Sequence, residues 1–130
     1  MAGARSTNGN ACVTMVDMRI ELEEYLDARD RNYYREWLTT LDASVRARVI
    51  KSVLRMGDGN LSGAKPEGKG VSALRIDFGP GYRVYFGQDS DVLVILLIGG
   101  TKRRQAADIR QAKSLWMEYK TLKRKQQRER

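Results

Sequence analysis

The sequence has no histidine among its 130 residues and a single cysteine, Cys12. The absence of histidine excludes serine–histidine and cysteine–histidine catalytic pairs and removes the most common zinc ligand. A single cysteine excludes an intramolecular disulfide and a cysteine-cluster metal site. We therefore expect a protein without a metal or other cofactor, and its cysteine usage is typical of the reducing cytoplasm.

Long apolar runs are also lacking. The longest, Val92 to Ile98, has seven residues, whereas roughly 20 are needed to span a bilayer. The first residues do not contain the apolar segment of a secretory signal, so we expect no membrane partner. The composition predicts a disordered leader at residues 1–16, a single domain at 17–126 and a frayed basic tail at 127–130.

Acidic residues become scarce only toward the C-terminus. Up to Thr101 the chain has 13 basic and 13 acidic residues, whereas from Lys102 onward it has 11 basic and 3 acidic ones. The whole net charge of +8 therefore belongs to the last 29 residues. Such a concentrated basic segment favours a polyanionic partner, most simply nucleic acid. A solvated helix that keeps the protein soluble is the alternative interpretation.

Hydrophobic periodicity divides the chain into elements in the order β-α-α-β-β-β-α. Four glycines and a proline predict a loop at 58–70. We expect an α+β fold, in which a small antiparallel sheet packs with an N-terminal helical hairpin and a long C-terminal helix. The expected elements are an edge strand at 18–25, helices at 30–41 and from Asp42 or Ser44 to Gly57, a meander of strands at 71–78, 82–87 and 92–98 that Gly99-Gly100 ends, and a helix from Thr101 to about Lys125.

The turn at Gly79-Pro80-Gly81 determines the expected register of the first hairpin. A three-residue loop pairs Ile76 with Val84 and puts the alternating apolar residues on one face, whereas a two-residue loop would put each of them opposite a polar residue. The other face is then polar. Its expected cross-strand pairs are Arg75 with Tyr85 and Asp77 with Arg83.

The segment Leu74-Arg-Ile-Asp-Phe-Gly-Pro-Gly-Tyr-Arg-Val-Tyr-Phe86 resembles the core motif of the HigB-like addiction module killer toxins, a branch of the RelE/ParE superfamily. The resemblance covers about Met18 to Tyr119. It implies the RelE-like, microbial RNase-like arrangement of helices on a small antiparallel sheet. Further matching residues are Arg35-Glu-Trp-Leu38, Gly59-Asn60, Lys65-Pro66, Gly99-Gly100 before Lys102, and Gln105 with Asp108-Ile109.

This resemblance implies the toxin of a type II toxin–antitoxin system, an endoribonuclease that enters the ribosomal A site and cuts translated messenger RNA. The implied partners are the ribosome, messenger RNA and a small cognate antitoxin, often of the helix-turn-helix type. Operator DNA would be bound only through the antitoxin.

Metal-independent RNA cleavage uses the ribose 2′-OH as nucleophile. It requires a proton acceptor, cations for the charged transition state and an acid for the leaving oxygen. Without histidine, only lysine, arginine, tyrosine and carboxylates remain for these tasks, and arginine can bind a phosphate through two parallel hydrogen bonds. The candidate catalytic residues are Lys65, Arg75, Arg83, Tyr85 and Lys102, and the candidate RNA-binding residues are Lys69, Arg103 and Arg104.

The expected roles of these residues differ. Arg75 and Arg83 would bind the phosphate, Lys65 would accept a proton or act as a charge partner, and Tyr85 would stack on a base or transfer a proton. Arg83, Lys65 and Lys102 are the positions at which the resemblance implies basic functional residues. Each also has a structural interpretation, such as an ion pair for Arg83 and a solvated surface position for Lys65.

Two departures from the RelE pattern and two other functions keep alternatives open. Phe78 stands where RelE toxins have an arginine, and Asp108 stands roughly at their C-terminal tyrosine, so a carboxylate base at Asp108 is an alternative. A ParE-like inhibitor of DNA gyrase would share the fold without being an enzyme. A non-toxic RNA-binding relative is the third interpretation, and the HigB-like motif favours the nuclease over both.

Overall fold

The computed structural model describes residues 19–128 of the chain, so the expected leader at 1–16 lies outside the described residues. Within them the protein is α+β, with five strands and three α-helices, the last of which is long. The strands are β1 (Glu21–Glu24), β2 (Ala64–Gly68), β3 (Val71–Ile76), β4 (Tyr82–Ser90) and β5 (Leu93–Thr101), and the helices are α1 (Tyr33–Thr39), α2 (Ala43–Gly57) and α3 (Gln105–Arg128), which follows a 3-10 turn at Lys102–Arg104.

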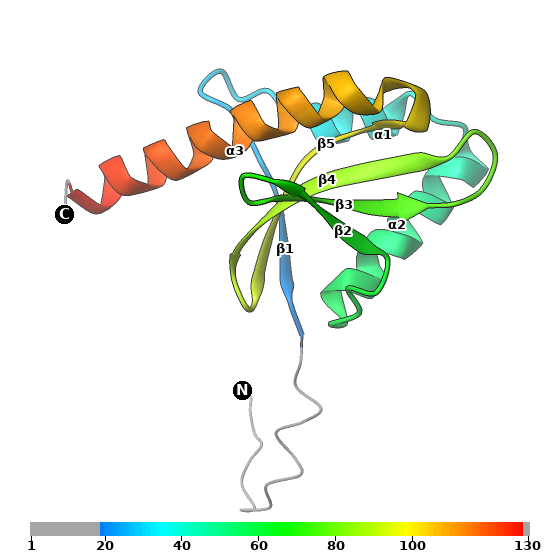
Figure 1. Cartoon of the computed structure of the whole chain (residues 1–130), viewed down its shortest axis with the longest axis horizontal. Coiled ribbons are helices and arrows are strands. Elements are labelled where there is room, and N and C mark those ends of the chain that lie inside the picture. Colours follow the sequence, from blue (N-terminus) through cyan, green and yellow to red (C-terminus); the bar gives the residue numbers. More distant parts are fainter. Residues whose placement is uncertain (1–18, 129–130) are drawn as a thin grey trace, which may run out of the picture.

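One sheet holds all five strands in the order β1-β5-β4-β3-β2 (Figure 1). The sheet is mixed, because β1 pairs with β5 in parallel while every other neighbouring pair is antiparallel. The expectation of a purely antiparallel sheet is therefore wrong. The expectation that the first strand is an edge strand is confirmed, and the exposed side chains of Glu21 and Glu23 suit a strand with one free side.

Strand β2 occupies part of the segment that was expected to be a loop, so that expectation is wrong. Lys65 and Pro66 pair with Ala73 and Ser72 of β3, and the register shifts between Pro66 and Gly68. Proline has no N–H to donate, and β2 has no strand on its outer side, so an edge strand tolerates it. Proline and glycine are common in irregular edge strands as well as in turns, so their content alone could not distinguish the two.

The β3–β4 hairpin differs from its expected register by two residues. Ile76 pairs with Tyr82 and Arg75 with Arg83, so the connection spans residues 77–81 and is longer than expected. The expected pairs of Arg75 with Tyr85 and Asp77 with Arg83 are wrong, because Tyr85 pairs with Ala73 and the strand ends before Asp77. A shift by two residues keeps every side chain on its face, so the expected apolar face is confirmed.

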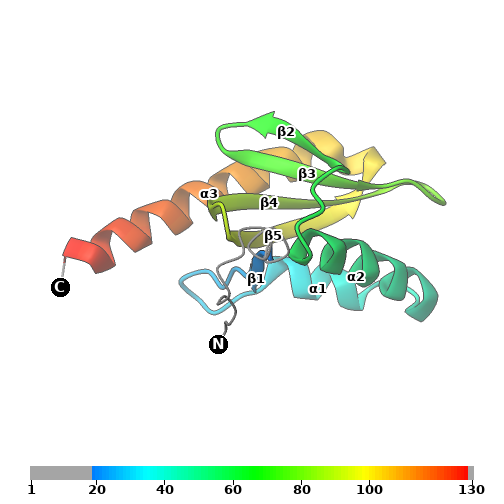
Figure 2. The same ribbon diagram turned by 90° about the horizontal axis from the view of Figure 1, so that it is seen from below.

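Helices cover both faces of the sheet (Figure 2). The first face carries α1 and α2, and its core contains Leu38, Val49, Val84 and Phe86 among other residues. The second face carries α3, and Ala112, Leu115 and Trp116 of α3 pack with side chains of β3, β4 and β5. The second face of the β3–β4 hairpin is therefore covered in its middle, whereas the sequence predicted a polar face.

Strand β5 runs through Gly99-Gly100, so the expectation that these glycines end the strand is wrong. A Cβ atom on Gly99 would lie 2.1 Å from the ring of Trp37, and a Cβ on Gly100 would lie 1.9 Å from Oδ2 of Asp108. Helices on opposite faces therefore approach the strand at successive residues. Glycine is required here for close packing, and not for a turn.

The two N-terminal helices are shorter or differently capped than expected. Helix α1 begins after Asn32, whose side-chain oxygen accepts a hydrogen bond from the backbone N–H of Arg35 at 2.8 Å. Asp42 occupies the N-cap position of α2, but its side chain makes no capping hydrogen bond. Arg46 of α2 donates to the carbonyl oxygens of Leu38 and Leu41 and so ties the two helices together.

Helix α3 matches the predicted C-terminal helix and extends to Arg128. The expectation of a frayed tail from residue 127 is therefore wrong at residues 127 and 128, and residues 129–130 lie outside the described residues. Its predicted apolar stripe is confirmed at Ala112, Leu115 and Trp116, which are buried. Within residues 19–128, no helix combines the length and the apolar character needed to cross a bilayer.

Candidate functional site

Three of the predicted cationic residues share the face of the sheet on which α3 packs. Arg75 and Arg83 are direct cross-strand neighbours, and Lys65 pairs with Ala73, which lies in the α3 core. Paired residues of antiparallel strands point to the same side, so Lys65, Arg75 and Arg83 form one group, called here the basic cluster. Lys65 and Arg75 are exposed, and Arg83 is only 8% exposed.

Arg83 is a buried cation without an anionic partner among residues 19–128. Its Nε atom is buried and makes no hydrogen bond, and no carboxylate in this part of the chain forms an ion pair with it. A buried guanidinium without a partner is costly, and natural structures usually pair it. Its cross-strand neighbour Arg75 adds a second positive charge. An anion from outside the described chain would satisfy both groups.

Tyr85 is buried beneath α3, and Asp108 lies in the first turn of that helix. Tyr85 is fully buried and its hydroxyl has no hydrogen-bond partner among residues 19–128, so the expectation that it projects from an open polar face with Arg75 and Arg83 is wrong. Burial, reinforced by the charge of Asp108, raises the pKa of Tyr85 to about 12. The phenol therefore stays protonated at neutral pH.

The carboxylate of Asp108 is the second buried ionisable group at this end of the sheet. Its Oδ2 atom lies against Gly100 and makes no hydrogen bond. Burial raises the pKa of Asp108, and the nearby guanidinium of Arg104 partly opposes that effect. The Nε of Arg104 lies 3.8 Å from Oδ1 of Asp108, but the Arg104 side chain is 71% exposed, so solvent weakens this pair.

The 3-10 turn before α3 places further cations near the basic cluster. The backbone N–H of Lys102 donates to the carbonyl oxygen of Gly81 at 3.0 Å, which brings the turn next to the β3–β4 connection. Lys102, Arg103 and Arg104 are all exposed. The structure therefore brings six of the eight predicted site residues to one end of the sheet: Lys65, Arg75, Arg83, Lys102, Arg103 and Arg104.

An open pocket of about 370 Å³ adjoins this end of the sheet. Its wall includes Gly100, Arg104 and Asp108 on one side and Arg31 and Trp37 on the other. The outer edge of β5 contributes backbone here, because β1 reaches only as far as Leu96 along that strand.

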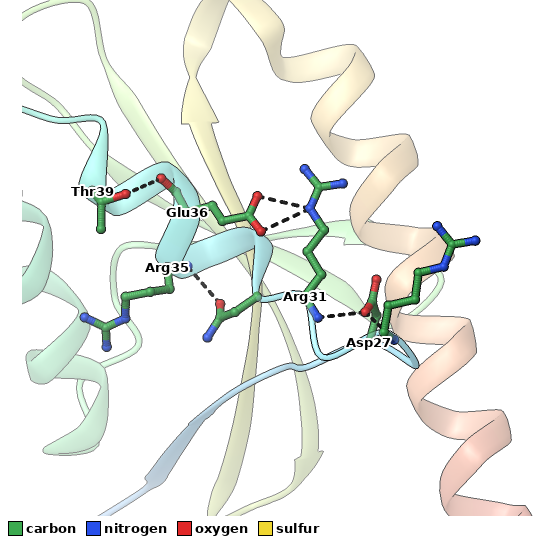
Figure 3. A network of polar contacts seen from close by, with 7 residues as sticks. Asp27, Arg31, Arg35, Glu36 and Thr39 are labelled. Atoms are coloured by element: carbon green, nitrogen blue, oxygen red, sulfur yellow. Dashed lines mark hydrogen bonds and ion pairs between the residues drawn. The ribbon is translucent and has the colours of Figure 1, made fainter.

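A hydrogen-bonded network holds the Arg31 side of this pocket (Figure 3). The carboxylate of Asp27 accepts from the backbone N–H groups of Arg29 and Arg31, at 2.8 and 2.9 Å. These bonds lower the pKa of Asp27. The Nε of Arg31 donates to both carboxylate oxygens of Glu36, at 3.0 and 3.1 Å. This segment is therefore ordered by local contacts before any ligand binds.

Lys69 is not part of the same end of the sheet. It lies in the turn between β2 and β3 and lines a different pocket with Lys113, Trp116 and Lys120. The structure therefore does not bring Lys69 together with Arg103 and Arg104, the other candidate RNA-binding residues.

Sequence reasoning missed several charged residues near these pockets. Arg31 gave no signal, because the segment 25–32 has no periodicity and its structure depends on side-chain hydrogen bonds. Lys113 and Lys120 are seven residues apart, which places them on one side of a helix, and this spacing was a usable signal. Among residues 19–128 no group of three or more cysteine, aspartate or glutamate side chains is arranged to hold a metal ion.

Comparison with known proteins gives one relative that bears on identity. No family model matches the chain, and no solved structure matches it. A protein of Haemophilus influenzae (strain Rd), described as an uncharacterized protein, is 43% identical over 83 residues, which cover 63% of this chain and 84% of the relative. Identity at this level over most of the relative means that the chain belongs to the same protein family as this Haemophilus influenzae protein.

Proposed function

We propose that the protein is the toxin of a type II toxin–antitoxin system, in the HigB-like branch of the RelE/ParE superfamily. Its activity would be ribosome-dependent cleavage of messenger RNA. The motif from Leu74 to Phe86 supports the family, and the α+β fold with helices on a small sheet agrees with the expected RelE-like arrangement. A basic patch at one end of the sheet suits a phosphodiester substrate.

One observation carries this proposal. Arg83 is buried, lacks an anionic partner among residues 19–128, and stands directly opposite Arg75. Two arginines paired across adjacent strands supply the positive charge that a phosphate requires, and a phosphate accepts paired hydrogen bonds from arginine. A purely structural arginine in the same place would be expected to have a carboxylate or carbonyl partner.

The chemistry proposed for the site uses only side chains of this chain. The ribose 2′-oxygen attacks the adjacent phosphorus, the bond to the 5′-oxygen of the next nucleotide breaks, and a 2′,3′-cyclic phosphate remains on the upstream fragment. Arg75 and Arg83 would stabilise the extra negative charge on the phosphate oxygens in the transition state. Lys65, the exposed neighbour of this pair, would accept the 2′-OH proton when its amine is neutral and act as a charge partner when it is protonated, and the ammonium of Lys102 would donate a proton to the leaving 5′-oxygen.

Tyr85 and Asp108 would act indirectly in this scheme. Tyr85 is buried beneath α3, and the side chain of Asp108, in the first turn of α3, is buried against Gly100, so we assign neither a direct contact with RNA. Tyr85 lies two residues after Arg83 on β4, and Asp108 contacts Gly100, the residue of β5 that pairs with Arg83. We therefore assign them to the placement of Arg83 and of the turn at Lys102–Arg104.

The proposal is tested by inducing the wild-type protein and the double variant Arg75→Ala/Arg83→Ala separately in bacteria. Pulse labelling is expected to show an early loss of protein synthesis. Primer extension is expected to detect new 5′ ends within open reading frames. Both effects should disappear in the double variant, while Lys51→Ala on the opposite face leaves them unchanged. Intact messenger together with inhibited DNA supercoiling would instead indicate the gyrase inhibitor.

A further inference from the structure

The second half of α3 lies beside a groove whose charge is opposite to that of the protein as a whole. This groove has a volume of about 500 Å³ and lies between α3, β1 and β5. Glu23, Glu24 and Asp89 contribute its acidic side chains, and Leu26, Leu93 and Leu122 contribute apolar ones. It is called here the acidic groove. A negatively charged hollow on a chain of net charge +8 calls for a positively charged, partly apolar occupant.

The end of α3 has the chemistry of that occupant. Figure 1 shows that this part of the helix extends past the sheet. Residues 119–128, called here the overhang, contain no acidic side chain. Of their cations, Lys123 is the one that forms an ion pair within the described chain, with Asp89 at 2.5 Å. The remaining cations of the overhang are Lys120, Arg124, Lys125 and Arg128, all exposed.

The acids of the groove are only partly neutralised by their own chain. Glu24 pairs with Arg35, and Asp89 accepts from Lys123 and from the hydroxyl of Tyr119. Glu23 forms no ion pair among residues 19–128, and its pKa is raised by burial and by the charges of Glu21 and Asp89. A cation placed in the groove from outside would relieve this crowding of like charges.

We propose that two copies of the chain pair through this region, with the overhang of each copy lying in the acidic groove of the other. Such an interface is isologous, because the same surface of each copy carries both the acidic groove and the overhang. A two-fold axis then places the overhang of each copy against the acidic groove of the other. The two α3 helices would run antiparallel near Leu122. This pairing goes beyond the proposed function and does not depend on it.

Exposed apolar side chains mark the centre of the proposed contact. Leu26 is 52% exposed and Leu122 is 36% exposed, and both line the acidic groove. Such side chains become buried when a second helix lies along the groove, while the charges around them set its direction. A nucleic acid would meet the acidic side chains of this surface, so the second copy suits it better.

Sedimentation velocity on the full chain, over a wide concentration range, measures this pairing. We expect a dimer that dissociates on dilution and weakens as salt is raised. Two charge reversals, Glu21→Lys/Glu23→Lys and Arg124→Glu/Arg128→Glu, should each raise the dissociation constant by about tenfold or more, through repulsion of like charges. An equal mixture of the two variants should again form dimers, because each carries the complement of the other.

A matched control for the Arg124→Glu/Arg128→Glu variant is the reversal Lys51→Glu/Arg55→Glu on α2, which lowers the net charge by the same amount on the other face of the sheet and should leave the dimer intact. Circular dichroism establishes that each variant is folded. Wild-type protein that stays monomeric at every concentration would overturn the proposal. So would charge-reversed variants that still dimerise alone, or a mixture of the two that stays monomeric.

Discussion

The carboxylate of Asp108 lies directly against the backbone of Gly100, so close that a Cβ atom on Gly100 would lie 1.9 Å from Oδ2. This contact joins the first turn of α3 to β5, on the strand next to Arg83. Any residue other than glycine at position 100 would place its Cβ atom on the buried carboxylate of Asp108. Together with the packing of Ala112, Leu115 and Trp116, this contact holds α3 against the sheet.

Replacement of Gly100 by alanine is expected to destabilise the protein by about 1–3 kcal/mol, the usual cost of overpacking. Urea unfolding measures the change. In the double variant Gly100→Ala/Asp108→Ala, part of the loss should be recovered, because the clashing carboxylate is gone. Additive losses in the double-mutant cycle would contradict the contact.

The stability of the protein should depend on pH through Asp108. Burial raises the pKa of this carboxyl above its unfolded value, so the native state binds the extra proton as pH falls. The penalty of the ionised group is fully present above the native pKa and disappears below the unfolded value, so stability from this group falls as pH rises. Relative to Asp108→Asn, the wild type should gain stability in urea unfolding as the pH is lowered from neutrality toward the unfolded pKa of aspartate, about 3.9. A constant difference across that range would contradict the assignment.

Asp89 anchors the second half of α3 to the end of β4. Its Oδ2 accepts hydrogen bonds from the hydroxyl of Tyr119 and from Nζ of Lys123, both at 2.5 Å, and these bonds lower the pKa of Asp89. Tyr119→Phe should therefore cost about 1 kcal/mol in urea unfolding at neutral pH. The exposed Thr121→Ala serves as control, with a change within about 0.5 kcal/mol. Equal effects of the two variants would show that the hydroxyl contributes nothing.

Lysine at position 83 should not restore the function of the arginine. Lysine keeps the charge but loses the planar fork that binds a phosphate through two hydrogen bonds. For Arg83→Lys we expect messenger cleavage at least about 100-fold slower, the usual cost of removing a donor to a transition state. Thermal unfolding checks that the variant is folded, and the measurement is the rate of messenger loss after induction. Full activity of a folded Arg83→Lys would mean that Arg83 does not bind the phosphate.

Local patterns in the sequence predicted much of the fold. Alternation in Leu74, Ile76, Val84 and Phe86 identified the apolar face correctly even though the register was two residues off, because an even shift preserves the faces. The long C-terminal helix was also predicted from its periodicity. These features depend on neighbours in the chain, which a single sequence displays.

Features that depend on distant contacts were not predicted. Gly99-Gly100 lies inside a strand because Trp37 and Asp108 pack on it from two sides. Tyr85 is buried because α3 crosses its face, although its arginine neighbours suggested a polar surface. The charge of the basic cluster was predictable, whereas the burial of Arg83 and its lack of a partner required the fold.

The most direct test of the central claim is a purified translation reaction on a defined messenger, with 5′ ends mapped in the presence and absence of ribosomes. We predict cuts within the reading frame only when ribosomes translate, each leaving a 2′,3′-cyclic phosphate upstream, and their loss in Arg83→Ala but not in Lys51→Ala. A messenger that stays intact with folded wild-type protein, or cuts that persist in Arg83→Ala, would contradict the account.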